Sequence, residues 1–328
     1  MRALSYDALL DERSEFDRLV DRTPDIDRFC SSSYWSFSAF ETLFADHEAW
    51  IRRAEDVDGY VALAHGRHPH IGNYLQPFEA SWGLASPFVA GRARPLIREF
   101  VREIRDPGLD WNMLFLSGLF EQSPQFRELV RRLRPDYELG IGPQMARNVA
   151  SLEGGFEDYL ARRSSKFRSN LRRSRRRAEE AGLETEYRCD LEAAEAVESV
   201  FERILDVERH SWKADQGTGI LDSPMRDFYE RMVPMLGGDG ALRVSFVVDG
   251  GTDVAYCFGG VTGDLYRGLQ LSYHDEYADY SPGNLAQITM IEGLCREGIE
   301  TYDMGQAMEY KERWAEAERE SLALIVRR

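Results

Sequence analysis

The chain has 328 residues, enough for one large or two medium domains with a sizeable core. Its composition is ordinary for a globular protein, with 43% hydrophobic and 30% charged residues. A net charge of -16 argues against broad binding to nucleic acid or an anionic membrane, so a polyanionic partner would require a local basic patch.

The N-terminal residues MRALSYDALLDERSEF lack the apolar segment of a signal peptide, and no stretch is long and apolar enough for a membrane span. We therefore expect a cytoplasmic protein. The four cysteines lie far apart and form no C-x-x-C pair, which indicates reduced thiols and neither a zinc site nor a disulfide framework. They are Cys30, Cys189, Cys257 and Cys295.

The first 150 residues alternate between helical and strand patterns. After a helical start, strands are expected at 50–54, 59–66, 82–91, 111–119 and 137–152, with helices at 95–104 and 124–134. This interleaving favours a layered α/β domain. The segment HGRHPHIG contains His65, His68 and His70 but no carboxylate or thiolate to complete a metal site. We expect a hairpin loop there and no metal.

Residues 162–182 form a basic segment with nine Lys or Arg and two Glu. Apolar residues recur at helical spacing and predict an amphipathic helix. They are Phe167, Leu171, Ala178 and Ala181. Two interpretations stay open. The helix is either a solvated one, with Arg175–Glu179 and Arg176–Glu180 pairs and Gly182 at its end, or an anion-binding one.

The second half predicts a further set of elements. A strand at 183–189 precedes a helix at 191–212 capped by Asp190, and a second helix covers 224–236. Three consecutive antiparallel strands follow at 241–251, 252–264 and 265–277. The chain then gives a helix from Pro282 to Gly298, a strand at 301–305, a short segment at 308–314 and a last strand at 321–328.

This order resembles the GNAT superfamily, in the branch of the CelD-type acetyltransferase-like proteins and the Fem-type peptidoglycan aminoacyltransferases. The segments that carry the resemblance are SSKFRSNLRRSRRRAEEAG, HSWKADQGTGI, FYERMVPML, LRVSFVVDGGTDVAYCFGG, YHDEYADYSPGNL and YDMGQAMEYKERW. The resemblance implies an α/β (α+β) fold of tandem GNAT-like lobes, each a mixed, mostly antiparallel sheet flanked by helices. The lobes would be a diverged one at 1–152 and an acyltransferase lobe at 183–328, joined by a basic connecting helix at 153–182.

The resemblance also implies a donor site. In the family the fourth strand splays from the fifth, the acyl thioester lies in the gap, and its pyrophosphate meets the start of the next helix. Four residues occupy that helix start here, namely Ser281, Gly283, Asn284 and Leu285. Together with Arg168 and Arg172 they are the expected cofactor contacts. Leu285 replaces the second glycine of the family loop, so a plain helix start capped by Ser281 stays open as an alternative.

Tyr310 and Lys311 match the family's Tyr-Lys or Phe-Lys pair beside the reacting ester. An ammonium on a flexible stem can follow a carbonyl oxygen as it becomes an oxyanion, which a planar guanidinium does less well. We therefore expect catalysis from Lys311, Tyr310 and Asp303, with Asp303 or one of His274, Asp275 and Glu276 as general base. Gln270, His274 and Trp212 are expected to contact the acceptor, although Trp212 also suits a core.

The sequence thus predicts an enzyme that transfers an acyl group from acyl-CoA, a co-substrate rather than a tightly bound cofactor, to an amine. The acceptor would be a small molecule or a peptide, and the oligomeric state is open. Two alternatives remain. One is a Fem-type enzyme that uses aminoacyl-tRNA, with the basic helix on the phosphates, and the other is a non-catalytic scaffold.

Overall fold

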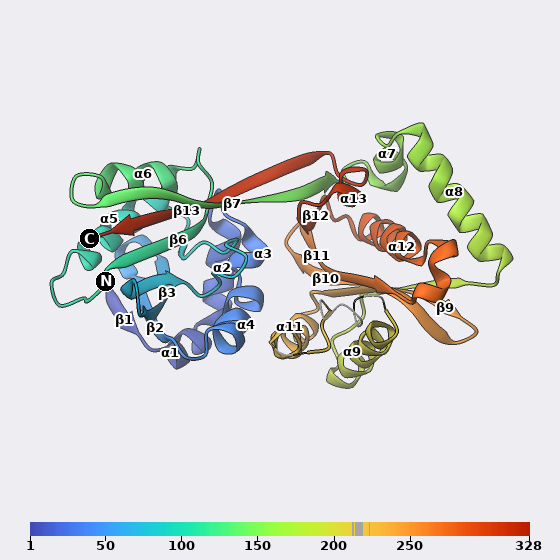
Figure 1. The fold of residues 1–328 in the computed structure, drawn as a ribbon, viewed down its shortest axis with the longest axis horizontal. Helices are drawn as coiled ribbons and strands as arrows, with labels where there is room; N and C mark the ends of the chain where they lie inside the picture. The colour runs from blue at the N-terminus through green and yellow to red at the C-terminus, as the bar shows by residue number, and fades with distance from the viewer. Residues whose placement is uncertain (212, 214–218, 223) are drawn as a thin grey trace. The chain divides into compact units, whose positions relative to one another are not determined.

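The computed structural model describes residues 1–211, 213, 219–222 and 224–328 (Figure 1). The chain forms two compact units, Met1–Ala146 with Glu320–Arg328, and Arg147–Arg319. It passes from one to the other within strands β7 (Glu138–Ser151) and β13 (Ala317–Arg327). The division at 152 and 182 predicted from the sequence therefore needs correction. The basic helix is part of the second unit, and residues 320–328 join the first because β13 pairs with β6.

The first unit contains a mostly antiparallel sheet with the strand order β1-β2-β3-β4-β6-β13-β7, and β5 pairs with β3. The remaining strands are β1 (Arg2–Leu4), β2 (Glu48–Ala54), β3 (Gly59–His68), β4 (Gly72–Pro77), β5 (Phe88–Ala90) and β6 (Met113–Leu119). The helices are α1 (Tyr6–Asp11), α2 (Arg13–Arg22), α3 (Arg28–Ser31), α4 (Ser33–Leu43), α5 (Ala93–Ile104) and α6 (Pro124–Leu133), with a 3-10 turn η1 (Glu55–Val57). Sequence analysis missed β1 and β4.

Alternation along β3 places two cores on the two faces of this sheet. Val61 and Leu63 pack with the apolar stripe of α5, whereas Tyr60 and Ala62 pack with residues of α2 and α4. The histidines lie in the β3–β4 hairpin, as expected, with His65 and His68 in β3. Across the described residues, no three His, Cys, Asp or Glu side chains gather closely enough to hold a metal ion.

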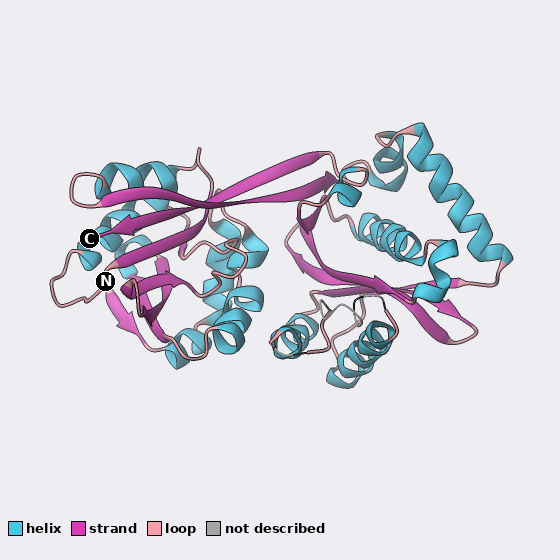
Figure 2. Ribbon diagram, viewed as in Figure 1, coloured by secondary structure: helices cyan, strands magenta, loops and turns pink. Residues whose placement is uncertain are grey.

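The second unit has the strand order β7-β12-β11-β10-β9-β8. The strands other than β7 are β8 (Glu184–Arg188), β9 (Leu242–Asp249), β10 (Thr252–Thr262), β11 (Leu265–Tyr273) and β12 (Thr301–Gln306). The helices are α7 (Gly155–Ala161), α8 (Ser165–Glu180), α9 (Ala194–Arg209), α11 (Met225–Gly238), α12 (Pro282–Glu297) and α13 (Glu309–Glu312), with the 3-10 turn η2 (Asp275–Tyr280). Figure 2 shows α9 and α11 on one face of this sheet and α12 on the other.

The two units repeat one topology, which confirms the predicted fold class. In the second unit, three antiparallel strands (β9, β10, β11) lead through α12 to β12, which pairs parallel with β11. In the first unit, β2, β3 and β4 are antiparallel and lead through α5 to β6, which pairs parallel with β4. Each unit is a mixed, mostly antiparallel sheet flanked by helices.

Strands β4 and β6, the parallel pair of the first unit, separate after two paired positions. Beyond that point a loop of the same unit is hydrogen-bonded to β6. β4 and β6 pair only at Tyr74 with Met113 and Leu75 with Leu114. Farther along β6, the amide of Gly118 donates to the carbonyl oxygen of Gly83 at 3.1 Å, in the loop that follows β4. Gly118 has φ +66, and a side chain there would collide with the backbone of Ala85.

A buried carboxylate holds that loop in shape. Glu79 is fully buried and accepts backbone N–H groups from four successive residues, Trp82 to Ala85, at 2.5–3.2 Å. Burial raises the pKa of Glu79, and the four amide bonds oppose that rise. The loop amides of the first unit are thus bonded to a side chain of the same unit.

Helix α8 confirms the amphipathic prediction with two differences. Its buried stripe is Phe167, Leu171, Ser174 and Ala178, whereas Ala181 is exposed beyond the end of the helix. Arg176 pairs with Glu180 at 3.7 Å as expected, but Arg175 bonds to Glu292 of α12 rather than to Glu179. The predicted cap of α9 is also wrong, because Asp190 accepts from Arg188 and the helix starts after Ala193.

Candidate active site

Strands β11 and β12 separate soon after they meet. They pair at three positions, the last being Arg267 with Asp303, although β11 continues to Tyr273 against β10. The β10–β11 register shifts beside this point, since Gly268 faces Gly259 and Gln270 faces Phe258. Such a bulge bends a strand locally and commonly lies next to a functional site. We call the space flanked by β11 beyond Arg267 and β12 beyond Asp303 the β11–β12 gap.

Lys311 of α13 reaches the β12 edge of this gap. Its ammonium donates to the carbonyl oxygens of Met304 at 2.7 Å and Gln306 at 2.9 Å, both beyond the last paired residue. The side chain is half-buried. The pKa of Lys311 is lowered to about 8. Burial is the largest cause, and the nearby positive charge of Arg267 is the second. The ammonium therefore lies on the part of β12 that is no longer paired with β11.

Lys213, from the segment after α9, reaches the opposite edge. Its ammonium donates to the side-chain oxygen of Gln270 at 2.8 Å and to the carbonyl oxygen of Leu271 at 2.7 Å. Burial lowers the pKa of Lys213. Sequence analysis missed this residue. A signal that could have found it is the rarity of lysine, because the chain has only three lysines among its 41 Lys and Arg.

Asp303 lies at the point where the two strands part, and it is buried. It forms ion pairs with Arg147 of β7 and with Arg267 of β11, the latter at 2.8 Å, and it accepts the amide of Gly305 at 2.8 Å. Proton uptake by this carboxylate would leave two buried guanidinium groups facing a neutral acid. The geometry therefore suits Asp303 to holding three strands together better than to removing a proton from an amine.

The start of α12 packs closely on β11. A side chain at Gly283 would come within 3.1 Å of both Leu271 and Tyr273, so glycine permits this approach. Pro282 is at the first helical position as expected, but Ser281 adopts φ +57 and its side chain forms no cap. The amides of Asn284 and Leu285 both donate to the carbonyl oxygen of Ser281, at 3.0 and 3.2 Å. The Leu285 side chain is in the core.

Comparison with known proteins matches this part of the chain to a family. Residues 165–312 match the family described as acetyltransferase (GNAT) domain. These residues belong to the GNAT superfamily. No curated protein matches the chain significantly in sequence.

The likeness in fold to solved structures extends beyond the matched residues. FemX has 12% identity and a TM-score of 0.65, covering 98% of this chain and 97% of its own. A conserved protein of unknown function from Bacteroides thetaiotaomicron has 10% identity and a TM-score of 0.64, with both chains covered completely. L-PGS from Bacillus licheniformis has 11% identity and a TM-score of 0.55, covering 96% and 91%. The family match supports an acyltransferase.

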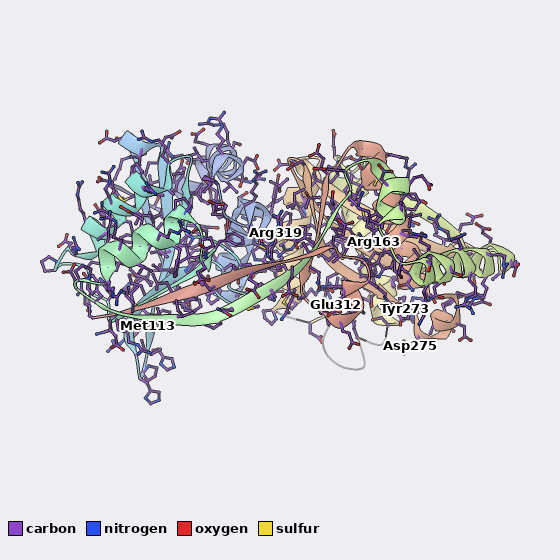
Figure 3. All side chains as sticks on the ribbon, turned by 90° about the horizontal axis from the view of Figure 1, so that it is seen from above. Met113, Arg163, Tyr273, Asp275, Glu312 and Arg319 are labelled. Carbon is purple, nitrogen blue, oxygen red and sulfur yellow. The ribbon has the colours of Figure 1, made fainter. Side chains whose placement is uncertain are left out.

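The other residues expected in the site differ in their exposure and in their hydrogen bonds. Tyr310 is 44% exposed, with its ring centre 5.7 Å from the Lys311 ammonium. Gln270 bonds to Lys213 and donates to the hydroxyl of Tyr229 at 3.2 Å. Trp212 lies outside the described residues. Figure 3 labels Tyr273 and Asp275 at the end of β11 and Glu312 on α13.

His274 directly follows β11 and is buried. Burial first, and then the neighbouring His210 ring at 5.0 Å between ring centres, lower the pKa of His274. Its Nδ1 is 3.9 Å from a carboxylate oxygen of Glu276. Its Nε2 is buried and has no hydrogen-bond partner within the described part of the chain. The ring is therefore neutral at pH 7 and able to accept a proton.

The cations of the basic helix α8 differ in whether they are bonded within the protein or exposed on its surface. Arg168 donates to three carbonyl oxygens at the end of α7, of Leu160, Ala161 and Arg163, at 2.6–3.4 Å, and so stabilises that helix end. Arg172 is exposed. Further exposed cations on α8 are Lys166, Arg173, Arg176 and Arg177. Arg168 thus has a structural partner that the sequence did not predict, whereas Arg172 lies on a cationic surface.

Helices α7 and α8 also fix the segment that carries Lys311. Trp314 is fully buried, and its ring meets Phe167 of α8 edge to face at 4.8 Å. The Tyr159 hydroxyl and Arg163 both donate to the carbonyl oxygen of Trp314, at 3.0 and 2.9 Å (Figure 3 labels Arg163). Sequence analysis missed this anchor because Trp314 is more than 140 positions from the residues in and between α7 and α8 that hold it.

None of the described helices is both long and apolar enough to span a membrane.

Proposed function

We propose that the protein is an N-acyltransferase that forms an amide in the β11–β12 gap of its GNAT unit. The nitrogen of a neutral amine attacks the carbonyl carbon of an acyl thioester, and the C=O electron pair moves onto oxygen. The tetrahedral intermediate then collapses, the C–S bond breaks, and the thiolate takes up the proton that the amine released. The position of the Lys311 ammonium at the edge of the gap carries this proposal.

Lys311 would stabilise the oxygen that becomes negative. Two of its N–H groups are bonded to carbonyl oxygens of β12, which fixes the ammonium without neutralising its charge. A charge fixed in a partly desolvated site stabilises a developing oxyanion better than a mobile one in water, because it needs no reorganisation during the reaction. We assign removal of the amine proton to His274, whose neutral ring lies at the end of β11, and the imidazolium then passes that proton to the departing thiolate.

The rate should fall as pH rises through about 8. The pKa of Lys311 is lowered to about 8, so the ammonium is present below that pH and is lost above it. The lost proton is the one that stabilises the oxyanion, and kcat should therefore show a falling limb near pH 8. A pH–rate profile of the wild type and of Lys311→Arg tests this. A guanidinium keeps its proton across this range, so the variant should be slower and should lack the limb.

The donor can be identified by binding. Acyl-CoA is our first assignment, since the GNAT family match supports a thioester donor. Aminoacyl-tRNA is the second candidate, supported by the exposed cationic surface of α8 and by the bonded amides at the start of α12. Thermal stabilisation by acetyl-CoA, with amide formation on a panel of amines, would support the first.

The second donor predicts the opposite pattern. Binding of bulk tRNA that weakens steeply between about 50 and 200 mM salt, with no effect of acetyl-CoA, would support aminoacyl-tRNA. Arg172→Ala and Arg173→Ala should then weaken tRNA binding. Absence of amide formation with both donors would contradict the proposed function.

A further inference from the structure

Two of the three lysines of this chain converge on one gap. Lys311 is bonded to β12 one and three residues beyond the last paired residue, and Lys213 is bonded to β11 three and four residues beyond it. Both sets of bonds therefore lie beyond the point where the two parallel strands part. The positive charge of Lys213 is also one of the causes that lower the pKa of Lys311, after burial and the charge of Arg267.

The surroundings do not neutralise this pair. The charged or titratable groups that act on Lys311 are Arg267 of β11, Asp303 of β12, Cys257 of β10 and Lys213. Asp303 already pairs with two guanidinium groups, and burial raises the pKa of Cys257 to about 11, so this thiol is uncharged at neutral pH. Glu208, which acts on Lys213, accepts the hydroxyl of Tyr256 at 2.8 Å. Two partly buried ammonium groups therefore face a gap with an excess of positive charge.

Each ammonium also has one N–H group that is bonded to no oxygen of the described residues. An ammonium carries three N–H donors, and within the described residues each of the two lysines has two oxygen acceptors. We propose that Lys213 is a second catalytic donor, and that Lys213 and Lys311 together bind the acyl oxygen from the two edges of the gap as it becomes negative. This inference rests on the proposed acyl transfer and adds a residue to it.

The rarity of lysine permits a direct test by NMR. The protein labelled with [13Cε]lysine has only three lysine signals, from Lys166, Lys213 and Lys311, and each signal reports its own protonation. Removing a nearby positive charge makes the protonated form of Lys311 less unfavourable, so Lys213→Met should move the Lys311 midpoint to higher pH. Lys213→Arg keeps the charge and should leave the midpoint close to the wild-type value. Lys166→Met, on the exposed face of α8, is the matched control and should leave the Lys311 midpoint unchanged.

Kinetics provide the second readout. Lys213→Met should lower kcat by about a hundredfold, as expected for loss of one oxyanion donor. The double variant Lys213→Met/Lys311→Met should be only slightly slower than the slower single variant, because both donors act on one oxygen. Circular dichroism of each variant establishes that it is folded, and Lys213→Gln replaces the methionine variant if that variant is not.

The outcomes distinguish a failure of the role proposed for Lys213 from a failure of the proposed acyl transfer. An unchanged Lys311 midpoint in Lys213→Met, or full activity of Lys213→Met beside a crippled Lys311→Met, would overturn the role of Lys213 and leave the acyltransferase intact. A wild-type protein that forms no amide with either donor, although its two lysines titrate as a coupled pair, would overturn the proposed function. In that case the oxyanion role of the pair would fail with it.

Discussion

We expect Lys311→Met to lower kcat for amide formation by about a hundredfold to a thousandfold. Methionine has a similar length and keeps the apolar packing of the stem, but it cannot stabilise negative charge on the acyl oxygen. The ammonium is bonded to Met304 and Gln306 in the folded protein, so the variant also loses two hydrogen bonds at the edge of the gap. A decrease in kcat with little change in KM would indicate that the lost interaction forms in the transition state.

Two variants serve as controls for this result. Lys166→Met removes a lysine that is exposed on α8 and should retain wild-type kcat with acetyl-CoA as the donor. Lys311→Arg keeps a positive charge in a bulkier, planar group and should also be slow, because a guanidinium is poorly shaped for following one oxygen. A Lys311→Met protein with the wild-type rate would remove Lys311 from the mechanism.

We expect Asp303→Ala to lower the free energy of unfolding by about 3–5 kcal/mol, the usual cost of removing one partner from a buried ion pair. Arg147, Arg267 and Asp303 are each at most 3% exposed, so the variant leaves two guanidinium groups buried without their carboxylate. These residues join β7, β11 and β12 where the gap opens. The loss should therefore appear as a lower urea midpoint for the GNAT unit.

Matched variants distinguish burial from charge in this experiment. Glu180→Ala breaks the exposed Arg176–Glu180 pair on α8 and should change stability by less than about 1 kcal/mol. Asp303→Asn keeps the size and one oxygen acceptor but removes the charge, and it should fall between the wild type and Asp303→Ala. Equal urea midpoints for Asp303→Ala and Glu180→Ala would refute a stabilising role for the buried ion pairs.

Local sequence patterns predicted the elements of the second unit well. Two tight turns, with Gly250–Gly251 and Gly263 at positive φ, separate β9, β10 and β11 within a few residues of the expected positions. Pro282 and Gly298 mark the ends of α12 as expected. Such signals are local, since a turn or a helix end depends on a few adjacent residues.

The residues that sequence analysis missed depend on distant parts of the chain. Asp303 looked like a free acid at a strand end, and only folding brings Arg147, 156 positions away, into contact with it. Lys213 is 98 positions from Lys311, so no local pattern indicated that the two lysines bond to the two strands that flank one gap. β4 was missed because its short, turn-rich segment becomes a strand only through pairing with β3 and β6.

Glu79 has a consequence for how the duplicated fold is used. In the first unit, four successive amides bind a carboxylate supplied by the same polypeptide, and the strand ends that part there are joined by the loop bearing it. An incoming anion would have to displace a covalently attached competitor whose effective concentration is very high. The first unit thus carries its own anion in this loop, and the acyl transfer that we propose is assigned to the second unit.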